Sequence, residues 1–106
     1  RLLLCPVGDS GLMQSLSERF GRYGVAPQRL IFKPKNLMPD YLALHHEVDV
    51  LLDTWPYTGG TTTNHALWMG VPVVTLRGPS RAHCQSAAAM GRMGMPSFWA
   101  RSEAAI

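Results

Sequence analysis

The stretch that decides the fold is residues 50–63, VLLDTWPYTGGTTT. Its first three residues are apolar on both faces, as expected for a central strand of a parallel sheet. Residues 53–60 are rich in turn-forming residues, and the three threonines at 61–63 open the next apolar-periodic segment. A strand, a tight loop and a helix in this order are typical of a parallel α/β fold, which we therefore predict.

The same succession of a short apolar run and an amphipathic stretch occurs four times along the chain. This alternation predicts an open parallel sheet with helices on both faces. Asp9 or Ser10 is the expected cap of the first helix. The predicted strands are 2–5, 30–32, 50–52 and 71–76, the predicted helices cover about 12–23, 37–48, 61–69 and 81–93, and Phe98 and Trp99 begin a further element.

Length and composition limit the classes of protein that fit. With 106 residues, the chain is expected to form a single domain over residues 1–106. Its 46% hydrophobic and 16% charged residues exclude a disordered chain. No apolar run reaches the length of a membrane span, and two cysteines without CxxC spacing indicate neither a disulfide scaffold nor a zinc site. We therefore expect a cytoplasmic protein and, since the chain opens in an apolar run without Met, a piece of a longer one.

The net charge of +3 comes from the second half of the chain. Residues 1–53 hold six basic and six acidic side chains. The later residues hold Arg77, Arg81, Arg92 and Arg101 against only Glu103. A local surplus of arginine suits an anionic ligand, whereas no run of Lys or Arg tracks a nucleic-acid backbone. We expect a small phosphate-bearing partner and no nucleic acid.

The candidate site lies where a strand passes through a glycine-rich loop into a helix. Ligands of open parallel sheets bind at the carboxyl ends of the strands. Gly59 and Gly60 let the backbone approach a ligand, and the hydroxyls of Thr61, Thr62 and Thr63 add donors to the unpaired N–H groups of the helix. The alternative is a tight loop followed by one capping threonine. Three successive β-branched residues open a helix poorly unless their hydroxyls are used, which favours a phosphate site.

Other residues near this loop have two interpretations. Arg77 follows the strand at 71–76 and is a candidate donor to an anion at the same edge of the sheet. His65, one turn into the helix that begins at the threonines, either faces the ligand or packs on the sheet. Trp68 and Met69 fall in a helix that faces the sheet, so we predict that they belong to the core.

Two segments of the chain carry a resemblance to a known family. Residues 49–63, DVLLDTWPYTGGTTT, and residues 66–76, ALWMGVPVVTL, resemble the catalytic C-terminal region of O-linked N-acetylglucosamine (O-GlcNAc) transferases, especially their bacterial relatives. Weaker similarity extends back through residues 29–32 and forward to residues 94–96. The resemblance therefore covers most of the chain.

The resemblance implies a glycosyltransferase of the two-lobed GT-B type, usually preceded by tetratricopeptide repeats. Its Rossmann-like C-terminal lobe holds the UDP of the donor, UDP-N-acetylglucosamine (UDP-GlcNAc), and this chain would be part of that lobe. The implied reaction is inverting transfer of N-acetylglucosamine to Ser or Thr hydroxyls of a protein acceptor, with no metal and no cofactor.

The same resemblance assigns roles by motif position. It implies that Thr61 and Thr62 donate to the diphosphate, that the adjoining loop borders the sugar, and that Tyr41 contacts the uridine. It assigns no catalytic residue to this chain, because the acceptor-side base lies outside these residues.

Two positions depart from the family pattern. His65 stands where the family commonly has an acid that accepts hydrogen bonds from ribose hydroxyls, and an imidazole offers at most one acceptor. Cys84 stands where relatives usually have the arginine of a Ser-Arg pair, although His83, Arg81 and Arg77 are close in sequence. These departures leave an alternative: a lobe that binds a nucleotide without catalysis, or a degenerate lobe that serves as an interaction module.

Overall fold

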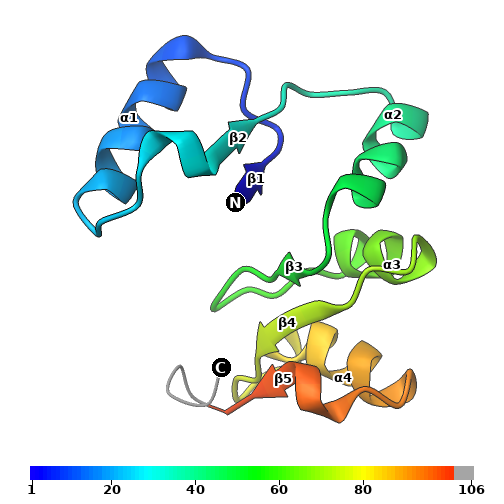
Figure 1. The fold of residues 1–106 in the computed structure, drawn as a ribbon. Helices are drawn as coiled ribbons and strands as arrows, with labels where there is room; N and C mark the ends of the chain where they lie inside the picture. The colour runs from blue at the N-terminus through cyan, green and yellow to red at the C-terminus, as the bar shows by residue number, and fades with distance from the viewer. Residues whose placement is uncertain (102–106) are drawn as a thin grey trace. The chain divides into compact units, whose positions relative to one another are not determined.

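The computed structural model describes residues 1–101 and separates into two compact units, Arg1–Tyr41 and the part from Leu42 onward (Figure 1). Both units consist of parallel strands joined through helices. The predicted α/β class with parallel strands is therefore confirmed. The strands hydrogen-bond within each unit, as one two-stranded and one three-stranded sheet.

The first unit is a β–α–β unit. Strand β1 (Leu2–Leu4) pairs in parallel with β2 (Leu30–Phe32). Helix α1 (Ser10–Gly21) lies between them in the chain and begins at Asp9, whose carboxylate accepts a 2.7 Å hydrogen bond from the N–H of Leu12. The prediction that Asp9 or Ser10 caps this helix is confirmed for Asp9. The short 3₁₀ helix η1 (Pro27–Arg29) leads into β2, and α2 (Met38–Ala43) begins in this unit.

The second unit continues the alternation of strands and helices. Its strands pair in parallel in the order β3, β4, β5, so that β4 is the central strand (Figure 1). The further element expected at Phe98 and Trp99 is the last 3₁₀ turn and β5. The elements are η2 (Leu44–Glu47), β3 (Leu51–Leu52), α3 (Thr61–Trp68), β4 (Val73–Leu76), η3 (Arg81–His83), α4 (Gln85–Arg92), η4 (Pro96–Phe98) and β5 (Trp99–Ala100).

The core of the second unit forms where α3 and α4 pack on β4. Its buried centre comprises Ala66, Val71, Val73 and Met90. Each helix is followed, two residues after its last residue, by a glycine with positive φ: Gly70 at 80° and Gly94 at 72°. This conformation reverses the chain toward the next strand. Partly buried residues around this centre are Val48, Leu51, Leu67, Met95, Phe98 and Trp99.

Two apolar residues that the sequence placed in the interior are exposed. Leu52 is 61% exposed, because its neighbour Leu51 packs on the core and successive side chains of a strand point to opposite faces. Trp68 is 85% exposed, so its assignment to the core is wrong. It lies two residues beyond the buried Ala66, which places it about 200° around the helix, on the opposite side.

The parallel order of β3 and β4 places the loops that follow them at one edge of this sheet. The two loops are also joined directly, since the N–H and the hydroxyl of Thr58 both donate to the carbonyl of Ala82, at 3.0 and 3.1 Å. Within residues 1–101, no helix has the length and apolar character needed to cross a membrane.

Candidate functional site

The loop between β3 and α3 is organised by the carboxylate of Asp53. One carboxylate oxygen accepts hydrogen bonds from the N–H groups of Thr54 (3.0 Å) and Gly59 (2.8 Å). The other accepts from the hydroxyl of the buried Thr75 in β4, at 2.7 Å. A single side chain at the end of β3 therefore joins both ends of the loop to the central strand.

Two buried hydroxyls hold the same loop from the side of α4. The hydroxyl of Ser86 donates to the carbonyl of Gly59 at 2.9 Å. The hydroxyl of Thr63, in the first turn of α3, lies 2.7 Å from that of Ser86. The loop and the first turns of α3 and α4 thus share one hydrogen-bonded cluster.

Gly59 has no room for a side chain. A Cβ atom there would lie 2.7 Å from the Thr63 hydroxyl oxygen and 3.2 Å from an oxygen of Asp53. At Gly60 the nearest atom to a Cβ is the amide oxygen of Gln85, at 2.8 Å, which is the far end of a flexible side chain. The close approach predicted for the glycines is used at Gly59 to pack the loop against α3.

The first turn of α3 offers free donors at this position. Its N-cap is Gly60, which supplies no capping side chain, and the carbonyl of Gly60 accepts the N–H of Asn64 at 3.1 Å. Thr61 and Thr62 follow it and are exposed. Unpaired N–H groups of a helix N-terminus and exposed hydroxyls are suitable donors to an anion.

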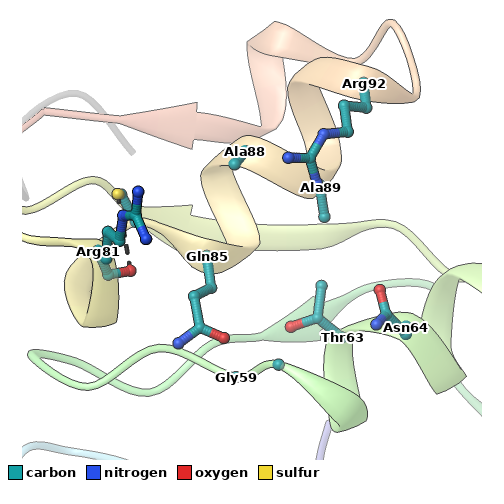
Figure 2. A pocket seen from close by; sticks show the side chains of 10 residues that line it. Gly59, Thr63, Asn64, Arg81, Gln85, Ala88, Ala89 and Arg92 are labelled. Carbon is teal, nitrogen blue, oxygen red and sulfur yellow. Dashed lines mark hydrogen bonds between the residues drawn. The ribbon is translucent and has the colours of Figure 1, made fainter.

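A cavity of about 480 Å³ opens between the first turns of α3 and the length of α4. Figure 2 shows Arg81 on one side of it and Arg92 on another, with Gln85 extending from α4 toward the glycine loop. None of the described residues that line the cavity is acidic, so its charge suits an anionic ligand. The lining residues are Gly59, Gly60, Thr63, Asn64, Arg81, Cys84, Gln85, Ala88, Ala89 and Arg92.

The predicted loop residues lie at or beside this cavity. Gly59, Gly60 and Thr63 line it, whereas Thr61 and Thr62 stand exposed in the adjoining turn. His65 is half-buried in α3, one turn after Thr61 and Thr62, and residues at this spacing share a helix face.

Two predicted site residues have other surroundings. The guanidinium of Arg77 lies over the ring of Trp99, 5.4 Å from its centroid, and Arg77 does not line the cavity. Tyr41 belongs to the first unit, where it is half-buried in α2 and its N–H donates to the carbonyl of Leu37 at 2.9 Å. The roles of these two residues remain predictions.

Sequence reasoning missed several residues of the site. Asp53 had a local signal, since it ends an apolar strand and opens a turn. Thr75, which bonds to Asp53, and Ser86, which bonds to Gly59, had none. Arg92 enters the sequence argument only through the surplus of positive charge, whereas the structure places it on the cavity. Cys84 also lines the cavity, and its thiol lies 3.7 Å from the carbonyl oxygen of Arg81.

The donor set of the site contains hydroxyl, amide and guanidinium groups. Within residues 1–101, no three His, Cys, Asp or Glu side chains gather in a way that could hold a metal ion. The groups that are present are hydrogen-bond donors to oxygen anions.

Known proteins with similar sequences are much longer than this chain. It is 34% identical over 99 residues to a probable UDP-N-acetylglucosamine–peptide N-acetylglucosaminyltransferase SPINDLY of Petunia hybrida, covering 92% of this chain and 11% of that protein. It is 38% identical over 81 residues to the SPINDLY protein of Solanum lycopersicum, covering 76% of this chain and 9% of that protein.

A solved structure has the same fold. A mutant O-GlcNAc transferase of Thermobaculum terrenum superposes with a TM-score of 0.88 at 36% sequence identity, over 92% of this chain and 19% of the transferase chain. Residues 2–105 match the family model of Glycosyl transferase family 41. The resemblance carried by residues 49–76 is confirmed: the chain belongs to Glycosyl transferase family 41 and is similar to part of the O-GlcNAc transferases.

Proposed function

We propose that this chain is the UDP-sugar-binding part of a protein O-glycosyltransferase that transfers N-acetylglucosamine from UDP-GlcNAc to Ser or Thr hydroxyls. Residues 1–106 would form part of the nucleotide-sugar-binding C-terminal lobe of a longer GT-B protein. The observation that carries the proposal is the glycine loop before α3, which borders a cavity with two arginines and no acidic residue among its described lining. The similar proteins of petunia and tomato are named as probable transferases of N-acetylglucosamine from UDP-N-acetylglucosamine to peptides, which supports the same donor and a protein acceptor.

The chemistry of the reaction requires donors where this site has them. Negative charge develops on the diphosphate of UDP as the glycosidic bond breaks. The N–H groups of the first turn of α3, with the hydroxyls of Thr61 and Thr62, would donate to that charge. Arg81 and Arg92 would add positive charge at the cavity. The base that accepts the proton of the acceptor hydroxyl would come from another part of the complete protein.

We also propose a cytoplasmic location. Cys5 and Cys84 are both free thiols in the structure. Unpaired cysteines are typical of proteins kept in a reducing compartment.

The direct test is a comparison of the complete protein with the isolated chain. The complete protein, incubated with UDP-GlcNAc and a Ser/Thr-containing acceptor, is expected to form glycosylated product. Residues 1–106 alone are expected to form none, because donor and acceptor meet in a cleft between two lobes. Product is measured as transferred radiolabelled sugar. Transfer by the isolated chain well above background would contradict the assignment of these residues to half of a site.

Replacing His65 by aspartate in the complete protein is expected to strengthen UDP binding. A carboxylate can accept from both ribose hydroxyls, whereas an imidazole offers at most one acceptor. One added hydrogen bond contributes about 0.5–1.5 kcal/mol, so the gain in affinity should be up to about tenfold. Calorimetric titration with UDP measures it.

Deoxyuridine diphosphate is the control ligand for this substitution. It lacks the 2′-hydroxyl, so the gain from His65→Asp should be smaller than the gain for UDP. If both ligands gain equally, or neither gains, His65 does not face the ribose, and the degenerate-lobe alternative is favoured.

A further inference from the structure

Both backbone polar groups of Gly59, its N–H and its carbonyl, are bonded to side chains from outside the glycine-threonine stretch. Its N–H donates to the carboxylate of Asp53 at 2.8 Å. Its carbonyl accepts the hydroxyl of Ser86 at 2.9 Å. Backbone groups in a loop before a helix are commonly left to solvent, so side-chain partners on the two successive peptide units that flank the Gly59 Cα restrict how the loop can turn.

Each of these two partners is itself held in place. Asp53 accepts a further hydrogen bond from the hydroxyl of Thr75, which is 2% exposed in the central strand β4. Ser86 has one hydroxyl hydrogen, which it gives to Gly59, so the 2.7 Å contact with Thr63 must be a donation from Thr63 to Ser86. The chain of donors therefore runs from the first turn of α3 through α4 to the loop.

These hydrogen bonds lie directly before the start of α3. A Cβ atom on Gly59 would lie 2.7 Å from the Thr63 hydroxyl oxygen, so the loop packs against α3 more closely than a residue with a side chain would allow. The next residue, Gly60, is the N-cap of the helix. The residue that precedes this N-cap is thus bonded to Asp53 and Ser86, neither of which lies in the glycine-threonine stretch itself.

We propose that Asp53 and Ser86 are positioning residues for the donor diphosphate. They hold the two peptide units on either side of the Gly59 Cα, so that the first turn of α3 meets the phosphates with its donors already aligned, which lowers the cost of ordering the loop when the ligand binds. This inference rests on the proposed function, because Asp53 and Ser86 would act through Gly59 on the same diphosphate site. Neither residue would touch the nucleotide.

The experiment compares two ligands on variants of the complete protein. Asp53→Ala removes all three acceptor contacts and is expected to lower UDP affinity at least tenfold, while affinity for uridine, which lacks the diphosphate, changes less than twofold. Asp53→Asn should restore most of the UDP affinity, because its amide oxygen can still accept from Gly59 and its NH₂ can donate to Thr75. Asp49→Ala, at an exposed carboxylate four residues earlier, is the matched control and should bind both ligands as the unmodified protein does.

Ser86→Ala provides an independent variant that removes a single hydroxyl. It leaves the Gly59 carbonyl and the Thr63 hydroxyl without their partner and should likewise lower UDP affinity several-fold more than uridine affinity. If Asp53→Ala does not fold, Ser86→Ala decides the question through the same pair of ligands. UDP affinity is measured by calorimetry, uridine affinity by ligand-observed NMR, and folding by circular dichroism.

The outcomes separate this inference from the proposed function. Failure of the unmodified protein to bind UDP would overturn the proposed function and this inference with it. UDP binding by the unmodified protein, together with unchanged or raised UDP affinity in the folded variants, would overturn the positioning role alone. Equal losses for UDP and uridine would also overturn it, since Asp53 and Ser86 would then support the whole nucleotide site rather than the diphosphate end.

Discussion

Replacing Met90 by alanine is expected to lower the free energy of unfolding by about 2–5 kcal/mol. Met90 is fully buried in α4 and packs with Ala66, Val71 and Val73, where the chain passes from α3 into β4. Truncation leaves a cavity among small side chains that cannot expand to fill it. The midpoint of urea denaturation, followed by circular dichroism, measures the loss.

Met93→Ala is the matched control, because it removes the same side chain three residues later. Met93 is 56% exposed, directly after the last residue of α4, and its truncation should change the free energy of unfolding by less than about 0.5 kcal/mol. Equal effects of the two substitutions would contradict the burial of Met90 in the core between α4 and β4.

Much of the fold can be predicted from local sequence because its signals are short. The apolar run Leu30–Phe32 forms β2 over those residues, and Asp9 caps α1 through its own side chain. Gly24, Gly70 and Gly94 follow helices and adopt positive φ, which L-residues with a side chain rarely do. Each of these features depends on residues within a few positions of one another.

Burial on one particular face is harder to predict. Trp68 continues the apolar content of α3, yet the helix has only Thr63 and Ala66 fully buried. A tryptophan in an eight-residue helix can be assigned to the core by composition, whereas its angle around the helix depends on which neighbouring residues contact the strand. Ala66 packs in the core beside Val73 of β4, which places Trp68, two residues later, on the outer side of the helix.

In the candidate site too, some residues could be predicted from local patterns, whereas others depend on contacts between distant parts of the chain. Gly59 and Thr63 could be predicted because glycines and threonines at a strand-to-helix junction are a local pattern. The Asp53–Thr75 bond joins residues that are 22 positions apart, and the Ser86–Gly59 bond joins residues 27 positions apart. Asp53 meets Thr75 only because β3 pairs with β4 in a register that bonds the N–H of Asp53 to the carbonyl of Val74. No local pattern in the sequence specifies that register.

Replacing Thr61 and Thr62 together by alanine in the complete protein is expected to lower UDP affinity at least tenfold. Hydrogen bonds to a charged phosphate contribute about 1.5–3 kcal/mol each, and the two hydroxyls stand exposed in the first turn of α3. The helix should persist, because alanine has a higher helix propensity than threonine and the N-cap is Gly60. Calorimetric titration with UDP measures the loss.

The control for the threonines is an exposed hydroxyl that is not at a helix start. Ser15→Ala, within α1, should leave UDP affinity unchanged. Uridine, which lacks the diphosphate, tests which part of UDP the hydroxyls contact. The double variant and the unmodified protein should bind uridine with nearly the same affinity, because the hydroxyls are assigned to the diphosphate. A folded double variant that binds UDP as tightly as the unmodified protein would show that the threonines only open the helix. The backbone N–H groups and the arginines of the cavity would then have to supply the phosphate contacts by themselves.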